Sequence, residues 1–265
     1  RGHYENRGEV VQRATPEVLT PFPNGAPRDR LGLAEWLTNA DHPLLARVTV
    51  NRYWQMIFGR GLVSTSEDFG MQGKPPTHPE LLDWLARDLI NSGWNLHHIL
   101  KKMVLSHTYR QESRIISLAQ EKDPENLLLS RSSAYRLPAE MIRDGLLSHS
   151  QLLHKKIGGP SSKPYDLNVS FKPIHPDGAP NVYRRSLYTF WKRTGPTPVM
   201  MALDASKRDV CTVRRERTDS PSQSLILLNG TQFVEAARAL ADQLIAKHGE
   251  NNPMGLINDA FRQLT

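Results

Sequence analysis

Apolar residues recur every three or four positions through most of the first 110 residues, which predicts a helical first half. Helices are expected over residues 30–39, 44–58, 96–108 and in the segment that follows Thr77. Apolar side chains cover most of the circumference of the second of these, so it should be largely buried. The last two should form a tight antiparallel pair, because only a few residues connect them.

Residues suited to capping mark where these helices begin and end. Asp41 is the expected N-cap of the helix over 44–58. The sequences Thr77-His78-Pro79-Glu80 and Ser220-Pro221-Ser222-Gln223 each have the spacing of a capping box. The second box predicts a helix through Leu228, and Thr231 should cap a long amphipathic helix to about residue 247.

The second half of the chain has a less regular pattern. Helices are expected near 124–130, 138–153 and 198–203. Glycine and proline are frequent over 154–182, which predicts a long irregular loop. Aromatic and β-branched residues favour a strand over 185–193 and a weaker one over 210–214. The predicted fold is therefore mainly α, an irregular helical domain with a small antiparallel β element in its C-terminal half.

Proline and the apolar pattern also suggest the domain organisation. Residues 1–29 are polar and rich in proline, and should be extended. Residues 30–250 are expected to form a single helical domain, followed by a truncated C-terminal helix over 251–265. Because residue 1 is Arg and the last residues have the pattern of an interrupted helix, we expect the chain to be an excerpt of a longer protein.

Charge is concentrated in one segment. The chain has 34 Lys and Arg against 27 Asp and Glu, a net charge of +7. Residues 182–217 hold nine basic and three acidic residues and so contribute +6 of it, together with four aromatic residues. A basic surface suggests an anionic partner. A guanidinium beside an aromatic ring suits a planar anion such as sulfate, carboxylate or phosphate.

Other classes of site are excluded by composition. The single cysteine, Cys211, rules out an internal disulfide, a cysteine-rich zinc site and a CxxCH haem attachment within this chain. The metal-binding sequence HExxH is absent, and no metal site is predicted. No apolar run approaches the ~20 residues that span a bilayer.

The candidate ligand-binding residues are arginines and neighbouring aromatic residues. The set is Arg52, Arg110, Arg184, Arg185, Tyr188, Trp191, Arg193 and Arg214. No catalytic residue is assigned, and His107, at the end of an apolar helical stripe, is the one candidate for acid–base chemistry. The competing interpretation is structural: the arginines would pair with acids, as Arg52 with Asp68, and His107 would be a half-buried residue with its hydrogen bonds satisfied.

Many short motifs occur together in a fixed order. They include Asn51-Arg52-Tyr53-Trp54-Gln55, Phe58-Gly59-Arg60-Gly61, His78-Pro79-Glu80-Leu81-Leu82, Ser106-His107-Thr108-Tyr109-Arg110, Ile157-Gly158-Gly159-Pro160, Tyr183-Arg184-Arg185-Ser186-Leu187-Tyr188 and Val210-Cys211-Thr212-Val213-Arg214-Arg215. In these motifs the chain resembles the planctomycete-specific PSD C-terminal domain family, domain of unknown function 1553, over roughly residues 1–250.

The resemblance implies a context and assigns no catalytic residues. Such domains usually form the C-terminal part of large exported proteins, behind a companion planctomycete-specific domain and often a c-type haem domain. It therefore implies a periplasmic or otherwise exported location, upstream domains of the same polypeptide as partners, and haem, if any, outside this chain. No cofactor is expected in the chain itself.

Three functions remain open, and whether the chain is part of an enzyme stays undecided. The favoured one is a module that binds an anionic glycan, sulfated or carboxylated, through residues 182–217. The second is part of an oxidoreductase site that combines His107, Arg110, Arg184 and Arg185 and is served by an upstream haem. The third is a scaffold that docks on the upstream domain. Nucleic-acid binding is not expected, because no helix-turn-helix, zinc finger or RNP signature is present.

Overall fold

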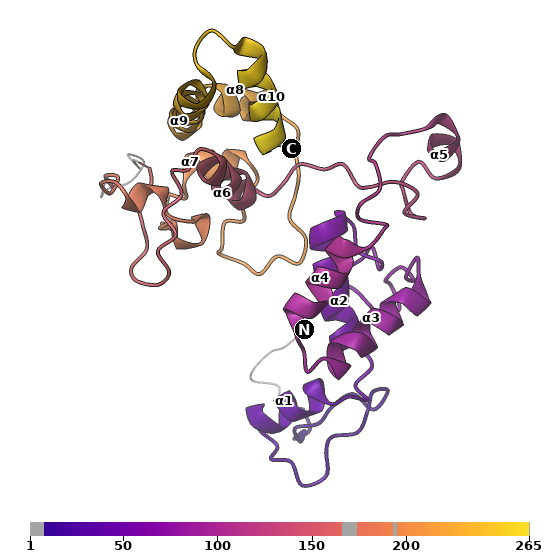
Figure 1. Ribbon diagram of the computed structural model, residues 1–265. Helices are drawn as coiled ribbons and strands as arrows, with labels where there is room; N and C mark the ends of the chain where they lie inside the picture. Colours follow the sequence, from indigo (N-terminus) through magenta and orange to yellow (C-terminus); the bar gives the residue numbers. More distant parts are fainter. Residues whose placement is uncertain (1–7, 166–173, 193–194, 265) are drawn as a thin grey trace. The chain divides into compact units, whose positions relative to one another are not determined.

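The computed structural model describes residues 8–165, 174–192 and 195–264. Within these residues the chain forms ten α-helices and two short 3₁₀ helices, which confirms the mainly helical prediction (Figure 1). It divides into two compact units, Arg1–Tyr135 and Arg136–Thr265. The predicted division into 1–29, 30–250 and 251–265 stays a prediction.

The first unit is built on three helices that pack side by side (Figure 1). Its helices are α1 (Arg30–Thr38), α2 (Leu45–Phe58), α3 (Pro79–Asn91), α4 (Leu96–Leu105) and α5 (Ser117–Lys122). Val50, Trp54 and Phe58 of α2 meet Leu82, Leu85 and Leu89 of α3 and Ile99 and Met103 of α4 in one buried cluster. The burial of these α2 side chains follows from the broad apolar surface of the helix.

Two of the predicted caps in this unit are wrong. The N-cap of α2 is Leu44, and the N–H groups of Leu44 and Leu45 donate to the imidazole Nδ1 of His42 instead of to Asp41. The N-cap of α3 is His78, with no side-chain cap. The backbone N–H of Thr77 donates to the carbonyl of Leu62, which ties this end of α3 to the preceding turn.

The helix expected near 124–130 is also wrong, because α5 ends before it. The carboxylate of Asp123 accepts hydrogen bonds from the backbone N–H groups of Leu127 and Leu128. Asn126 and Leu129 have positive φ angles of 53° and 57°. A side chain that satisfies nearby N–H groups allows the backbone to adopt a conformation other than a helix. The segment after Asp123 is therefore not helical.

The second unit surrounds a smaller core. Its helices are α6 (Ala139–His149), η1 (Asn181–Tyr183), η2 (Ser186–Tyr188), α7 (Pro198–Ala202), α8 (Pro221–Asn229), α9 (Thr231–His248) and α10 (Pro253–Leu264). Ala139, Met200, Leu203, Ala205 and Phe233 form its buried cluster. The capping box at Ser220 is confirmed, with Gln223 as its fourth residue.

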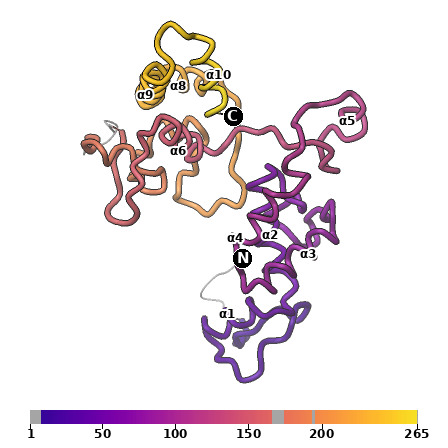
Figure 2. Tube along the Cα trace, viewed as in Figure 1, coloured from indigo at the N-terminus to yellow at the C-terminus, as the bar shows by residue number. Residues whose placement is uncertain are grey.

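The predicted β element is wrong for the described part of the chain, which contains no strand. Residues of the expected strand over 185–193 form η2 and isolated bridges, such as Ser162 with Thr189. Residues 210–214 are an exposed loop. Strand propensity reflects packing on a pleated surface, and neither segment has a neighbouring strand to supply one. Figure 2 shows residues 205–217 as an irregular connection to α8.

The first unit should depend on Leu89, whose side chain is fully buried between α2 and α4. We expect Leu89→Ala to lower the free energy of unfolding of this unit by about 2–5 kcal/mol, because a cavity replaces the lost side chain. Leu105→Ala, at an α4 side chain that is 55% exposed, is the control and should cost under about 0.5 kcal/mol. Denaturant unfolding followed by tryptophan fluorescence measures both, and equal losses would contradict the packing described here.

Candidate functional site

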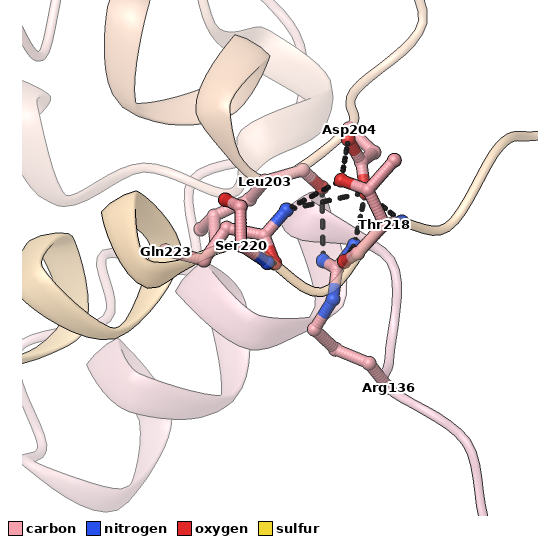
Figure 3. Close-up of polar contacts among 6 residues, drawn as sticks. All are labelled: Arg136, Leu203, Asp204, Thr218, Ser220 and Gln223. Carbon is pink, nitrogen blue, oxygen red and sulfur yellow. Dashed lines mark hydrogen bonds and ion pairs between the residues drawn. The ribbon is translucent and has the colours of Figure 1, made fainter.

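One polar cluster in the second unit joins the two ends of the loop over residues 205–217 (Figure 3). Asp204 precedes the loop and Thr218 follows it. The Asp204 carboxylate accepts the backbone N–H of Thr218 at 2.7 Å and its hydroxyl at 2.9 Å. The two ends of a 13-residue loop are therefore held at hydrogen-bond distance, the arrangement of an Ω-loop. We call Arg136, Asp204, Thr218 and Gln223 the clasp.

Arg136 spans both sides of the clasp. Its guanidinium donates to the carbonyl of Leu203 at 3.0 Å and to that of Thr218 at 3.3 Å, and it forms an ion pair with Asp204. The side chains of Arg136 and Asp204 are only 19% and 17% exposed. Opposite charges that are both largely removed from water, with further hydrogen bonds to each, hold a defined geometry better than an exposed pair.

Gln223 connects the clasp to α8. Its side-chain oxygen accepts the N–H of Ser220 at 3.4 Å, which is one bond of the capping box. Its amide nitrogen donates to Asp204 at 3.3 Å and to the Thr218 hydroxyl at 3.0 Å. The start of α8 and the base of the loop therefore share one side chain, as Figure 3 shows.

The carboxylate of Asp204 is stabilised in its ionised form. Burial alone would raise its pKa, but the hydrogen bonds from Thr218, the charge of Arg136 and the bond from Gln223 together hold the pKa below its usual value. The clasp is therefore an intact ion pair at neutral pH.

The loop that the clasp holds is basic and exposed. Residues 205–217 include five basic and two acidic residues, a net charge of +3, and every residue from 207 to 219 is exposed. Trp191 Nε1 donates to the carbonyl of Lys207 at 2.8 Å, and the Arg208 guanidinium lies 4.6 Å from the centre of the Trp191 ring. Arg215 pairs with Glu140 at 2.6 Å. These contacts fix the loop near both of its ends.

Two of the predicted ligand-binding residues have structural roles in this unit. Arg184 is 2% exposed, and its guanidinium donates to the carbonyls of Pro160 at 2.7 Å, Gly158 at 2.6 Å and Lys156 at 3.2 Å. It also lies 3.9 Å from the centre of the Tyr188 ring, and the Tyr188 hydroxyl accepts the N–H of Gly158. These groups hold the turn at Gly158-Gly159-Pro160. Ligand binding by either residue stays a prediction.

The other predicted residues are distributed over both units. Arg185 and Arg214 are exposed and Trp191 is half-buried, all in the second unit. Arg193 lies outside the described residues. Arg52, Arg110 and the candidate acid–base residue His107 are exposed in the first unit. Their roles in binding or catalysis remain predictions.

One extensively bonded side chain of the second unit was not among the predicted residues. Arg143 of α6 is 2% exposed and donates to the carbonyls of Arg184 at 2.8 Å and Val182 at 2.7 Å, and to the Gln232 side chain at 2.9 Å. A sequence signal was available, because Arg143 lies four residues after Ala139 and four before Leu147 and so shares one helix face with two apolar residues. The structure buries all three. For the clasp, the one signal in the sequence was the capping box that begins at Ser220, which includes Gln223.

The family model described as PSD1, protein of unknown function (DUF1553), matches residues 29–265. The chain belongs to this family. The match includes both units from the start of α1 and contains the clasp and its loop. No curated protein and no solved structure matches the chain.

Two further observations concern metal ligands and membrane spans. No group of three or more His, Cys, Asp or Glu side chains that could hold a metal ion occurs in the described residues. None of the helices that the structure describes is both long and apolar enough to cross a membrane.

The clasp should depend on the negative charge of Asp204. We expect Asp204→Asn to lower the free energy of unfolding of the second unit by about 1–3 kcal/mol, because hydrogen bonds to a charged group are lost in a largely buried place. Asp209→Asn, an exposed acid in the loop, is the matched control and should leave stability unchanged. Hydrogen exchange at the Thr218 amide should accelerate in the first variant only.

The same interaction predicts a pH dependence. Because the pKa of Asp204 lies below its usual value of 3.8, its contribution to stability is complete above that pH and is lost as the pH falls through the lowered pKa of the folded state. Unfolding measured from pH 6 to pH 2 should show this loss, and the difference between wild type and Asp204→Asn should shrink over the acid range. A constant difference would contradict the assignment.

Proposed function

We propose that the second unit binds an anionic ligand, most suitably a sulfated or carboxylated glycan, through the loop over 205–217 and the Trp191–Arg208 pair beside it. The observation that supports this is an exposed basic loop on a fixed base. A loop with constrained ends loses less conformational entropy on binding than a free one.

The basic side chains of the loop differ in how they are used. Arg208 and Arg214 are exposed and have no acidic partner among the described residues, whereas Arg215 is paired with Glu140. A guanidinium offers a planar fork of N–H donors that fits the oxygens of sulfate and carboxylate groups. Arg208 and Arg214 are therefore the leading contacts for the ligand.

Of these two arginines, Arg208 is better suited to bind the ligand, because it contacts Trp191. A guanidinium that stacks on an aromatic ring keeps the N–H donors in its plane available. Because the Trp191 Nε1 is itself bonded to the carbonyl of Lys207, the ring is held in place under the cation. The pair therefore presents donors that are already oriented.

A glycan fits this surface better than a nucleic acid. The loop over 205–217 contains no aromatic residue on which bases could stack, and the Trp191 ring beside it has the Arg208 guanidinium over its face. The proposal includes the context that the family resemblance implies: an exported protein in which upstream domains, one of them carrying c-type haem, precede this chain. No observation within either unit favours an oxidoreductase site.

Binding to defined polymers tests the proposal. We expect the chain to bind heparin, as a sulfated probe, or polygalacturonate, as a carboxylated one, but not neutral dextran, with an affinity that falls as salt is raised. Arg208→Gln and Arg214→Gln should each weaken binding about 1.4- to fivefold, as expected for an exposed charge contact of ~0.2–1 kcal/mol.

Lys101→Gln, which removes one exposed charge from α4 in the first unit, is the control and should leave affinity unchanged. An equal loss in this variant would show that only net charge matters and would overturn the proposed site. Absence of binding to all probes, or tighter binding to duplex DNA, would overturn the ligand class.

A second candidate function is docking on the upstream domain, and the surface of α10 favours it. Met254, Ile257, Phe261 and Leu264 are each 56–66% exposed on this amphipathic helix. Large apolar side chains grouped on a surface are typical of an interaction site. Ile257→Ser should weaken association with the co-expressed upstream domain in a pull-down, while Arg208→Gln should not, and the reverse pattern would contradict docking through α10.

A further inference from the structure

A cavity in the first unit is unrelated to the basic loop. It has a volume of about 290 Å³ and lies between the turn over 40–43 and the helices α2 and α3. Its lining combines the polar side chains of His42, Arg47, Asp83 and Arg87 with the apolar Ala46 and Ala86. Ligand pockets commonly start at about this size and join an apolar surface to a few polar groups.

His42 lines this cavity and has an unused hydrogen-bond donor. The residue is 7% exposed, and its Nδ1 accepts the backbone N–H groups of Leu44 and Leu45. A neutral imidazole that accepts at Nδ1 carries its proton on Nε2. Burial lowers the pKa of His42, which favours this neutral form. The Nε2 is buried and has no hydrogen-bond partner among the described residues, an arrangement that usually indicates a missing partner.

The two arginines of the cavity are used differently. Arg47 donates from Nε to Asp83 at 2.5 Å and from a terminal nitrogen to the carbonyl of Pro43, so it is held within the fold. Arg87 makes one long hydrogen bond, 3.5 Å to the carbonyl of Ala40. Most of the donors on the Arg87 guanidinium therefore remain available to a ligand.

We propose that this cavity binds the carboxylate of a small molecule, with the Arg87 guanidinium and the Nε2–H of His42 as its donors. A planar guanidinium fork and a neutral N–H together match the two oxygens of a carboxylate. The apolar side chains of Ala46 and Ala86 accommodate the carbon part of the ligand. His42 is held in place because its other nitrogen caps the start of α2.

The charges of the lining favour a singly charged group. Arg47 and Arg87 are balanced by the carboxylates of Asp41 and Asp83, which also line the cavity. A dianion such as sulfate would leave more uncompensated negative charge there than a carboxylate does. Asp41 is exposed and could accept an ammonium group, so both simple carboxylic acids and amino acids have the required chemistry.

Titration of the ¹⁵N-labelled chain tests this proposal at pH 7.5, where His42 is neutral. Sodium propionate should shift the imidazole resonances of His42 and the Nε resonance of Arg87 to saturation. Sodium sulfate at the same ionic strength and n-propylamine should not. L-alanine should also bind, and tighter binding of alanine than of propionate would assign the natural ligand to amino acids.

Arg87→Gln should weaken propionate binding at least tenfold, since the charged fork is lost. Arg87→Lys keeps the charge but loses the planar fork of donors, so its affinity for propionate should lie between those of Arg87→Gln and wild type. Arg30→Gln, an exposed arginine of α1 that does not line the cavity, is the matched control and should bind as wild type does.

Unsaturable shifts, equal shifts with sulfate, or wild-type affinity in folded Arg87→Gln or Arg87→Lys would each overturn the proposal. Because the cavity and the basic loop belong to different units, Arg87→Gln should leave heparin binding intact. The two proposals can therefore fail separately.

Discussion

The second unit depends on arginine side chains that hydrogen-bond to backbone carbonyls. Arg136, Arg143 and Arg184 together donate to seven such carbonyls. A backbone without regular structure must still satisfy its polar groups when it is buried. Here guanidinium groups supply the donors that neighbouring strands would supply in a sheet. Replacing one of these arginines would leave several buried carbonyl acceptors without a hydrogen-bond donor at once.

This constraint divides the basic residues of the unit into two groups. Arg143 and Arg184 are 2% exposed and their donors are directed at the protein. Arg185, Arg208 and Arg214 are exposed, and the clasp at Asp204 and Thr218 presents the last two on a loop of fixed ends. The first group makes a rigid base from irregular backbone, and the second is free to contact an anion. The positive charge of the segment is therefore divided between buried arginines that hold the fold and exposed arginines that the proposed ligand would contact.

The first unit uses more conventional packing and places its polar site at the edge. Its three central helices bury a continuous apolar cluster. The cavity beside His42 and Arg87 lies where the turn over 40–43 meets α2 and α3. His42 links the two features, because the imidazole that caps α2 also lines the cavity. A carboxylate site there would rest on the helix packing and would be independent of the basic loop.

The sequence by itself determined most of the helices, the capping box at Ser220 and membership of the family, because periodicity and ordered motifs are properties of neighbouring residues. It predicted a strand over 185–193 from residue types alone, although no partner strand exists among the described residues. It also could not separate buried Arg184 from exposed Arg185. Their difference arises from carbonyls 24 to 28 positions away. The clasp likewise joins Arg136 to Asp204 and Thr218, 68 and 82 positions later. Only the tertiary structure decides such partners, because a guanidinium can bond to any carbonyl that the fold brings within reach.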